Sequence, residues 1–163
     1  MNFKNYIDNI QDFPKKGIIF RDIQPLIEDE QIFQKAIISM GKLVPKPDLW
    51  VGIESRGFIF ASALAAKYGG GLSLIRKKGK LPNKGLKSIS YELEYGFDCI
   101  EIKSSKKKKN VIVVDDVLAT GGTMDAAEKL CSSANLSVLD KLVLIDLGFS
   151  AISKNVKSLI QYE

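Results

Sequence analysis

Hydrophobic and polar residues alternate along this chain in blocks that predict strands and helices in turn. The clearest apolar block, residues 111–114, consists of four consecutive β-branched residues, which is typical of a parallel strand covered on both faces. A short polar loop follows, and residues 124–130 have the spacing and composition of a helix. We therefore expect a strand, a loop and a helix in direct succession at this point of the chain.

The same patterns predict the other elements. Residues 31–43 have the apolar spacing of an amphipathic helix, which Pro45 and Pro47 would end. We expect further helices at 5–10 and 58–67, strands at 49–53, 71–75 and 138–147, the arms of a hairpin at 89–93 and 98–102, and a terminal element at 156–162. This alternation predicts an α/β fold with a mainly parallel sheet flanked by helices, in which ligands bind beyond the carboxyl ends of strands.

Composition limits the class of protein. The chain of 163 residues is 45% hydrophobic and 26% charged, which fits a single globular domain over residues 1–163. Its apolar runs stay well short of the roughly 20 residues that span a bilayer. The first residues lack the apolar core of a secretory signal. We therefore expect a cytoplasmic protein without a membrane partner.

The inventory of reactive side chains is small. Histidine is absent, and Cys99 and Cys131 are the only cysteines. This excludes a zinc site of the Cys/His type and a histidine-based catalytic triad. Acid–base chemistry must therefore fall to carboxylates, lysines or tyrosines, and the two cysteines are most simply interpreted as reduced thiols.

The net charge of +5 favours anionic partners, which could be nucleic acid, a membrane surface or a polyphosphate substrate. Residues 103–109 hold five lysines without interleaved aromatic residues, a pattern that favours a solvated turn. The basic residues of segment 76–87 are instead separated by glycines and a proline. That composition predicts a mobile basic loop that can close over an anion.

Candidate chemistry is concentrated after the predicted strand at 111–114, where Asp115 and Asp116 precede a loop of small residues. Glycines before a helix leave free N–H groups for an anion, and the hydroxyls of Thr120 and Thr123 can add donors. The loop has neither the Lys-Ser/Thr of a P-loop nor the spacing G-x-G-x-x-G. Carboxylates beside a phosphate fit a ligand that also offers hydroxyls, such as a ribose 5-phosphate. The alternative is an ordinary strand end with an acidic approach to a helix.

These residues carry a resemblance to a known family. The segment VVDDVLATGGT (113–123) resembles the 5-phosphoribosyl-1-pyrophosphate (PRPP) motif of the type I phosphoribosyltransferases. The stretches at 12–23, 54–58 (ESRGF), 75–82, 91–96 (YELEYG) and 161–163 resemble the adenine-specific members in order and spacing. The resemblance implies that family's mainly parallel sheet, with a small N-terminal hood at roughly residues 1–30 and a flexible catalytic loop at roughly 77–97.

The resemblance also implies a reaction. Adenine and PRPP would be the small-molecule partners, converted to AMP and pyrophosphate in purine salvage. Mg²⁺ would be the cofactor, bound mainly through PRPP and pyrophosphate, so that no residue is assigned as a dedicated metal ligand. A homodimer is implied as well. Two alternatives stay open: a phosphoribosyltransferase for another base, and a PRPP-sensing regulator that binds nucleic acid, although we expect no nucleic-acid partner.

Site residues follow from the same resemblance. Glu94 matches the family's acid–base glutamate. Residues expected to bind the phosphate and ribose of PRPP are Asp115, Asp116, Ala119, Thr120, Gly121, Gly122 and Thr123. Those expected at the pyrophosphate are Ser55, Arg56, Arg76, Lys77, Lys80 and Tyr95, and those expected at adenine are Ile19, Phe20, Arg21 and Leu147. The peptide between Glu54 and Ser55 is a candidate for the cis bond that family members often have there.

Simpler interpretations exist for several of these residues. Arg56 could make only a structural salt bridge, and Ile19 and Phe20 could be core residues. Residues 91–94 could form a strand whose charged face lies in water. The sequence also departs from the family pattern, since position 54 is often Asp there, and the lysine run at 106–109 has no counterpart that we can assign.

Overall fold

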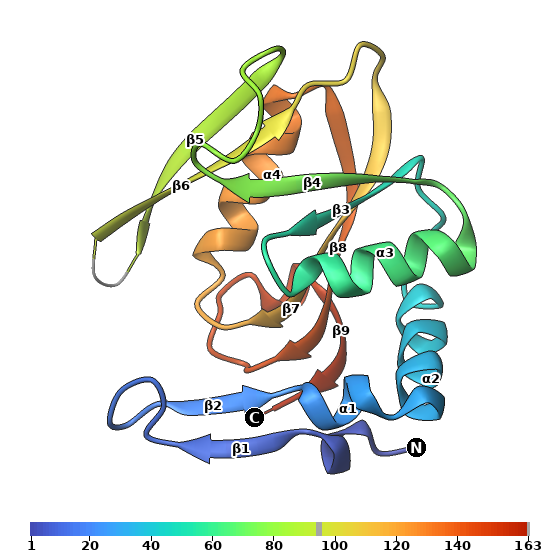
Figure 1. Ribbon diagram of the computed structural model, residues 1–163, viewed down its shortest axis with the longest axis vertical. Helices are drawn as coiled ribbons and strands as arrows, with labels where there is room; N and C mark the ends of the chain where they lie inside the picture. Colours follow the sequence, from blue (N-terminus) through green and yellow to red (C-terminus); the bar gives the residue numbers. More distant parts are fainter. Residues whose placement is uncertain (94–95, 163) are drawn as a thin grey trace.

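A mixed sheet forms the centre of the structure, a computed structural model that describes residues 1–93 and 96–162 (Figure 1). Among these residues the sheet has seven strands in the order β5-β6-β4-β3-β7-β8-β9. The parallel strands are β4 (Gly71–Lys77), β3 (Leu49–Ile53), β7 (Lys109–Leu118), β8 (Leu136–Asp146) and β9 (Lys157–Gln161). The strands β5 (Leu86–Leu93) and β6 (Gly96–Lys103) form an antiparallel hairpin beside β4. The predicted α/β fold with a mainly parallel sheet is confirmed.

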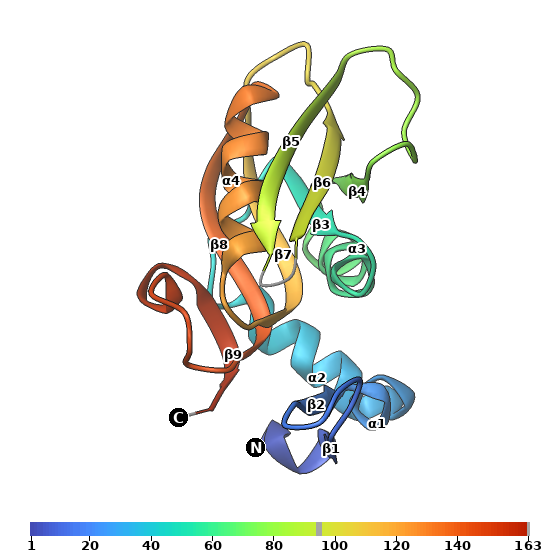
Figure 2. The same cartoon turned by 90° about the vertical axis from the view of Figure 1, so that its left-hand side faces the viewer.

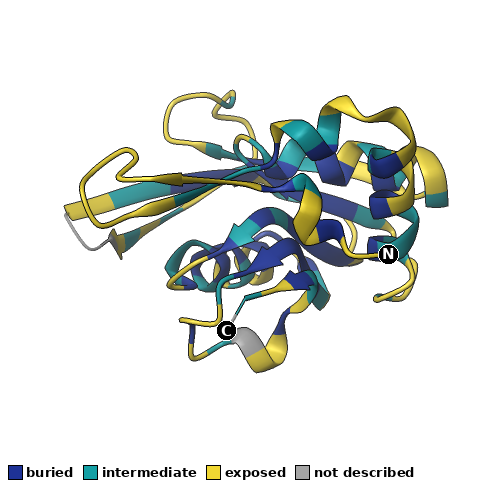
Figure 3. Ribbon diagram, turned by 90° about the horizontal axis from the view of Figure 1, so that it is seen from below, coloured by how far each residue is buried: buried dark blue, intermediate teal, exposed yellow. Residues whose placement is uncertain are grey.

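Helices cover both faces of this sheet (Figures 1 and 2). The helices α2 (Glu30–Gly41) and α3 (Gly57–Tyr68) pack on one face together with Ile112 and Val114. The helix α4 (Gly122–Ser133) packs on the other face, in a second cluster that contains Val111 and Val113. Because successive side chains of a strand point to opposite faces, β7 is buried on both sides, which is why its sequence is continuously apolar. Figure 3 shows burial concentrated in this central region.

A small separate layer is formed by the N-terminal part of the chain, and the C-terminal end lies beside it (Figure 1). It consists of the 3₁₀ helix η1 (Phe3–Tyr6), the antiparallel strands β1 (Asp8–Gln11) and β2 (Ile19–Asp22), and the short helix α1 (Gln24–Glu28). The Arg21 guanidinium lies 4.0 Å from the centre of the Tyr162 ring, so the C-terminal segment contacts this layer. We call residues 1–28 the hood.

The predicted helix at residues 5–10 is wrong. The chain forms only the short helix η1 (Phe3–Tyr6), and Ile7 then takes an extended conformation with a φ of −118°. Residues Asp8–Gln11 pair with β2 instead, so that neighbouring backbone supplies their hydrogen bonds. The apolar pattern of six residues cannot by itself distinguish a helix from a strand, because a helix of that length is marginal without tertiary packing.

The segment expected as a mobile basic loop contains more regular structure than predicted. Arg76 and Lys77 belong to β4, Lys87 belongs to β5, and only residues 78–85 form turns between the two strands. The hairpin arms are also longer than predicted, since pairing continues from Leu86 opposite Lys103 to Leu93 opposite Gly96. In the described residues no helix is long and apolar enough to cross a membrane.

One close contact between α3 and β7 gives a testable prediction. A Cβ atom on Gly57 would lie 2.7 Å from the Val114 carbonyl oxygen and 3.0 Å from Asp115 Oδ1. We expect Gly57→Ala to lower the free energy of unfolding by about 1–3 kcal/mol, the usual range for an overpacked site. Urea denaturation would measure it. Gly122→Ala is the matched control, because Gly122 also opens a helix and its Cβ would have a nearest neighbour at 3.7 Å. Equal losses in both variants would contradict the packing argument.

Candidate functional site

The carboxyl ends of three adjacent parallel strands form one edge of the sheet. In the register of this sheet Ile53 of β3 lies beside Ile75 of β4, and Gly52 lies beside Val114 of β7. The segments that follow these strands therefore meet at the place where ligands bind in parallel sheets. A cavity of about 220 Å³ lies there, lined by Ile53, Glu54, Ser55, Arg56, Lys77, Tyr91, Ile100, Asp115, Asp116 and Thr123. Six of these ten residues are among those expected from sequence.

The turn after β3 places Arg56 against the acidic pair. The peptide between Glu54 and Ser55 is cis, as the resemblance suggested. Arg56 Nε lies 2.7 Å from Asp116 Oδ2, and the Arg56 guanidinium lies 5.1 Å from the centre of the Phe20 ring. The simple salt bridge considered for Arg56 is therefore present. The side chain is nevertheless 36% exposed, so it remains open to a ligand.

The two acids at the end of β7 differ in their surroundings. Asp116 is only 6% exposed, and its Oδ2, which faces Arg56, accepts no well-aligned hydrogen bond. Asp115 Oδ1 accepts the backbone N–H of Asp116 at 2.9 Å. Burial, together with the neighbouring charge of Asp116, raises the pKa of Asp115 well above its ordinary value. Asp115 therefore becomes protonated at a higher pH than an ordinary aspartate does.

The loop between β7 and α4 is built to bring backbone close to an anion. Gly121 precedes the helix with a φ of +90°, a conformation that favours glycine. A Cβ atom there would lie 2.3 Å from Ser150 Oγ, whose hydroxyl donates to the Thr120 carbonyl at 3.0 Å. A cavity of about 90 Å³ is lined by Ala119, Thr120, Gly121 and Thr123, together with Asp115, Val117, Leu118 and Met124. The first N–H groups of α4 have no acceptor within the helix and can bind an anion at this cavity.

The basic end of β4 is held by a carboxylate that we had not included among the expected site residues. Glu54 accepts hydrogen bonds from the Lys80 ammonium, from the backbone N–H of Lys77 at 2.8 Å and from Arg76 Nε at 3.4 Å. Burial alone would raise the pKa of Glu54, but these hydrogen bonds and the Lys80 charge outweigh it and lower the pKa to about 2. The sequence indicates Glu54 as part of the ESRGF segment and of the candidate cis peptide, but nothing in that pattern reveals its hydrogen-bond partners.

Lys77 of β4 and Tyr91 of β5 also line the cavity, and both contact Asp98 of β6. Lys77 makes an ion pair with Asp98, and this hydrogen bond raises the pKa of Lys77. The Tyr91 hydroxyl accepts a hydrogen bond from Thr123 Oγ1 at 3.3 Å and approaches Asp98 Oδ2 at 3.5 Å, while burial raises the pKa of Tyr91. Tyr91 lies opposite Asp98 in the β5–β6 register. This pairing depends on the register of the hairpin, so sequence spacing alone could not identify the contact between Tyr91 and Asp98.

The residues expected at adenine lie in the hood and after β8. Ile19 is 47% exposed, so its interpretation as a core residue is wrong. Phe20 is half-buried and packs edge-on against Phe13 with ring centres 5.2 Å apart. The Arg21 side chain is already engaged, because it donates to Asn9 and covers Tyr162. Leu147 is half-buried and its N–H donates to the Leu118 carbonyl at 3.0 Å.

Some expected features lie elsewhere. Glu94 and Tyr95 are outside the described residues. Lys106, Lys107 and Lys108 are exposed before the start of β7, at the opposite end of that strand from Asp115.

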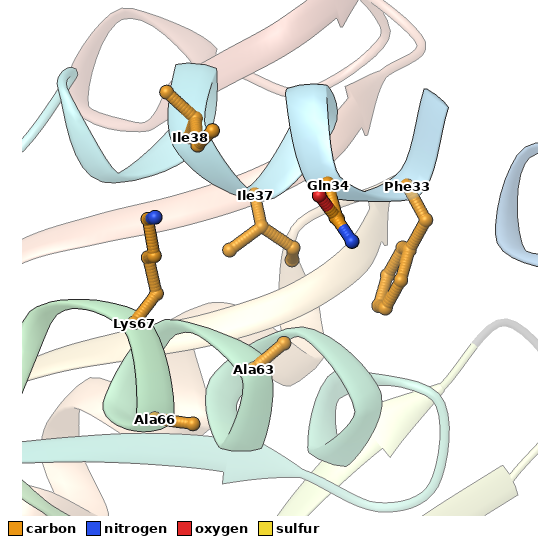
Figure 4. Close-up of a pocket in the computed structure, with 7 residues that line it drawn as sticks. All are labelled: Phe33, Gln34, Ile37, Ile38, Ala63, Ala66 and Lys67. Atoms are coloured by element: carbon orange, nitrogen blue, oxygen red, sulfur yellow. The ribbon is translucent and has the colours of Figure 1, made fainter. Parts of the chain in front are cut away.

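A larger cavity of about 470 Å³ lies between α2 and α3, lined by Phe33, Gln34, Ile37, Ile38, Ala63, Ala66 and Lys67 (Figure 4). Its lining is mainly apolar and includes no carboxylate, so the candidate chemistry lies in the smaller cavities.

Comparisons with known proteins agree with this arrangement. The family described as phosphoribosyl transferase domain matches residues 28–155. An adenine phosphoribosyltransferase from Hydrogenovibrio crunogenus is 44% identical over 97% of this chain and 95% of its own, and one from Carboxydothermus hydrogenoformans is 44% identical over 99% and 100%. The crystal structure of the enzyme from Thermoanaerobacter pseudethanolicus superposes with a TM-score of 0.91, at 40% identity and 98% coverage of both chains. The Saccharomyces cerevisiae enzyme, solved with adenine and an imino-altritol bisphosphate, has a TM-score of 0.86 at 36% identity, covering 96% of this chain and 94% of its own.

The environment of Glu54 predicts a pH dependence of stability. Its pKa is lowered from 4.5 to about 2 in the folded state, so the unfolded chain binds this proton at a higher pH. The stabilisation is therefore complete above about pH 4.5 and is lost as the pH falls toward 2. We expect the free energy of unfolding, measured in urea, to fall less steeply over this interval in Glu54→Gln. Glu30→Gln, at an exposed position, should keep the wild-type slope. The same slope in all three proteins would refute this prediction.

Proposed function

The chain belongs to the phosphoribosyltransferase family and, within it, to the adenine phosphoribosyltransferases, and we propose that it converts adenine and PRPP to AMP and pyrophosphate in purine salvage. This is a pentosyl transfer, catalysed by an enzyme of the glycosyltransferase class. One observation carries the proposal: Asp115 and Asp116 line the same cavity as Arg56 and Lys77. The cavity thus offers acceptors for ribose hydroxyls beside cations for a pyrophosphate.

The PRPP phosphate is proposed to bind the loop of Ala119, Thr120, Gly121, Gly122 and Thr123. The free N–H groups at the start of α4 and the two threonine hydroxyls would donate to it. The ribose hydroxyls would then donate to Asp115 and Asp116. The position of Asp116 supports this, because its Oδ2 faces Arg56 without a well-aligned hydrogen bond and so keeps acceptor capacity for a ligand hydroxyl. The negative charge of the pair would also stabilise positive charge that develops at the anomeric carbon.

The pyrophosphate is proposed to bind Ser55, Arg56, Arg76, Lys77, Lys80 and Tyr95. The exposed basic groups at the end of β4 support this assignment, since a pyrophosphate carries several negative charges. Mg²⁺, carried on the pyrophosphate oxygens, would supply further charge neutralisation. The residues present fit such an ion, because Asp115 and Asp116 could accept from its bound waters without dedicated protein ligands.

Adenine is proposed to bind between Phe20 and Leu147. The Arg21 side chain is engaged with Asn9 and Tyr162, which favours recognition by the backbone of Ile19 and Arg21. As N9 of adenine forms its bond to the anomeric carbon, the bond to pyrophosphate breaks and Glu94 would accept the N9 proton. The half-exposed Ile19 and Phe13 beside Phe20 support an apolar binding surface for the base.

The wider organisation is proposed on the same basis. We propose that the whole chain acts as one domain, with the hood over adenine and residues 77–97 closing on PRPP to exclude water. A homodimer and a cytoplasmic location are also proposed. The location is supported by Cys99 and Cys131, which are both free thiols in the structure, as expected in a reducing compartment.

Base choice tests the proposed function most directly. Adenine presents a donor at N6 and an acceptor at N1, whereas hypoxanthine presents an acceptor and a donor there. Fixed backbone groups would leave two mismatches, each costing about 1–3 kcal/mol. We expect kcat/KM for hypoxanthine to be at least ~10²-fold lower than for adenine, with saturating PRPP and Mg²⁺. Comparable values would indicate another base, and no AMP formation together with salt-sensitive binding of nucleic acid would favour a regulator.

The role of Glu94 gives a separate prediction. A general acid–base group contributes about 10²–10⁴-fold to the rate. We expect Glu94→Gln to lower kcat by a factor in this range and to change the pH profile of kcat. Glu92→Gln, at an exposed position of β5, should leave both unchanged. An unaltered rate and profile in Glu94→Gln would assign proton transfer to another group or to solvent.

A further inference from the structure

The carboxylate of Glu54 connects the turn after β3 to the basic end of β4. One oxygen, Oε1, accepts the Lys80 ammonium, and the other, Oε2, accepts the Lys77 backbone N–H and Arg76 Nε. The Glu54 side chain is only 11% exposed, whereas those of Arg76 and Lys80 are 32% and 49% exposed. The Glu54 carboxylate is therefore less exposed to solvent than the two cations that it holds.

The contacts on the other side of the turn reinforce this arrangement. Arg76 Nη1 approaches the Lys80 carbonyl at 3.5 Å, and the N–H of Lys80 donates to the Lys77 carbonyl at 3.3 Å. Arg76 and Lys80 are thus brought together, although like charges repel each other. The carboxylate offsets this repulsion and gives the Lys77 N–H an acceptor that the sheet does not supply. Without it, the strand end would have two neighbouring cations and an unpaired donor.

We propose that Glu54 is a positioning residue of the pyrophosphate subsite. Its carboxylate holds the end of β4 and the following turn, so that an anionic ligand meets Arg76 and Lys80 already ordered. A ligand that must immobilise flexible side chains when it binds loses affinity. Because Arg76 and Lys80 are already ordered, a ligand that contacts them avoids this cost. The inference rests on the proposed function for the identity of the ligand, but the binding of an anion can be measured without turnover.

The test is the affinity for inorganic pyrophosphate, measured by calorimetry in magnesium buffer. We expect Glu54→Gln to weaken binding about tenfold, as for two side chains that must be ordered on binding. Glu54→Asp keeps the charge on a shorter arm and should recover most of the affinity. Glu30→Gln removes the same charge at an exposed and distant position and should bind as the wild type does. Tighter or unchanged binding in Glu54→Gln would overturn the proposal, because Glu54 would then merely compete with the ligand or be irrelevant to it.

A double-mutant cycle distinguishes positioning from a general loss of structure. If Glu54 acts through Lys80, the double variant loses less binding free energy for pyrophosphate than the sum of the losses in Glu54→Gln and Lys80→Gln. Fully additive losses would overturn the proposal. If circular dichroism shows that Glu54→Gln does not fold, Glu54→Asn, which also removes the charge but is smaller, takes its place in the cycle with Lys80→Gln.

Steady-state kinetics gives an independent measure. We expect KM for PRPP to rise in Glu54→Gln, while KM for adenine and kcat stay within about threefold of the wild-type values. A fall in kcat with KM for PRPP unchanged would overturn the positioning role. Failure of the proposed function would be distinct, since the wild type would then form no AMP whatever the pyrophosphate affinities of the variants.

Discussion

The pairing of β7 with β3 is the constraint on which the rest of the site depends. Both strands are parallel and lie in the middle of the sheet, with helices on both faces. Because β7 is buried on both sides, it cannot shift in register without exposing apolar side chains or burying Asp115 and Asp116 more deeply. The position of the acidic pair relative to Glu54 and Arg56 is thus determined by the core. The close approach of Gly57 to the Val114 carbonyl limits the freedom of the same junction further.

Charge compensation is the second principle of the site. Arg56 is paired with Asp116, Lys77 with Asp98, and both Arg76 and Lys80 with Glu54. A cluster of cations that attracts a polyanion would destabilise the folded protein if its charges were left unopposed. The carboxylates reduce this repulsion in the ligand-free protein, and the partly exposed cations remain able to contact a ligand. In the proposed function the same residues would therefore serve both the stability of the fold and the binding of an anion.

The sequence predicted the strand–loop–helix unit around Asp115 because each of its signals is local. Four β-branched residues, two acids and two glycines all lie within residues 111–122, and no distant contact is needed to interpret them. The hood was harder to predict, since the conformation of residues 8–11 depends on their pairing with residues 19–22 rather than on their own hydrophobic pattern. The roles of Asp98 and Glu54 depend on contacts across strands, over 21 and 26 residues of separation to Lys77 and Lys80 respectively. Such pairings require the register, which a single sequence does not contain.

The absence of histidine shapes how this cavity responds to pH. Hydrogen bonds hold the pKa of Glu54 near 2, the ion pair with Lys77 lowers the pKa of Asp98 despite its burial, and the pKa values of Lys77 and Tyr91 are raised. All four shifts move titration away from neutrality. Asp115 differs, because burial and the charge of Asp116 raise its pKa well above the ordinary value. Among the carboxyl groups near the cavity that the structure describes with a shifted pKa, Asp115 is therefore the one whose surroundings favour the protonated form. A ligand hydroxyl that hydrogen-bonds to this carboxyl would meet an acceptor in the ionised form and a donor in the protonated form, so the proposed binding of ribose there would be coupled to the protonation of Asp115.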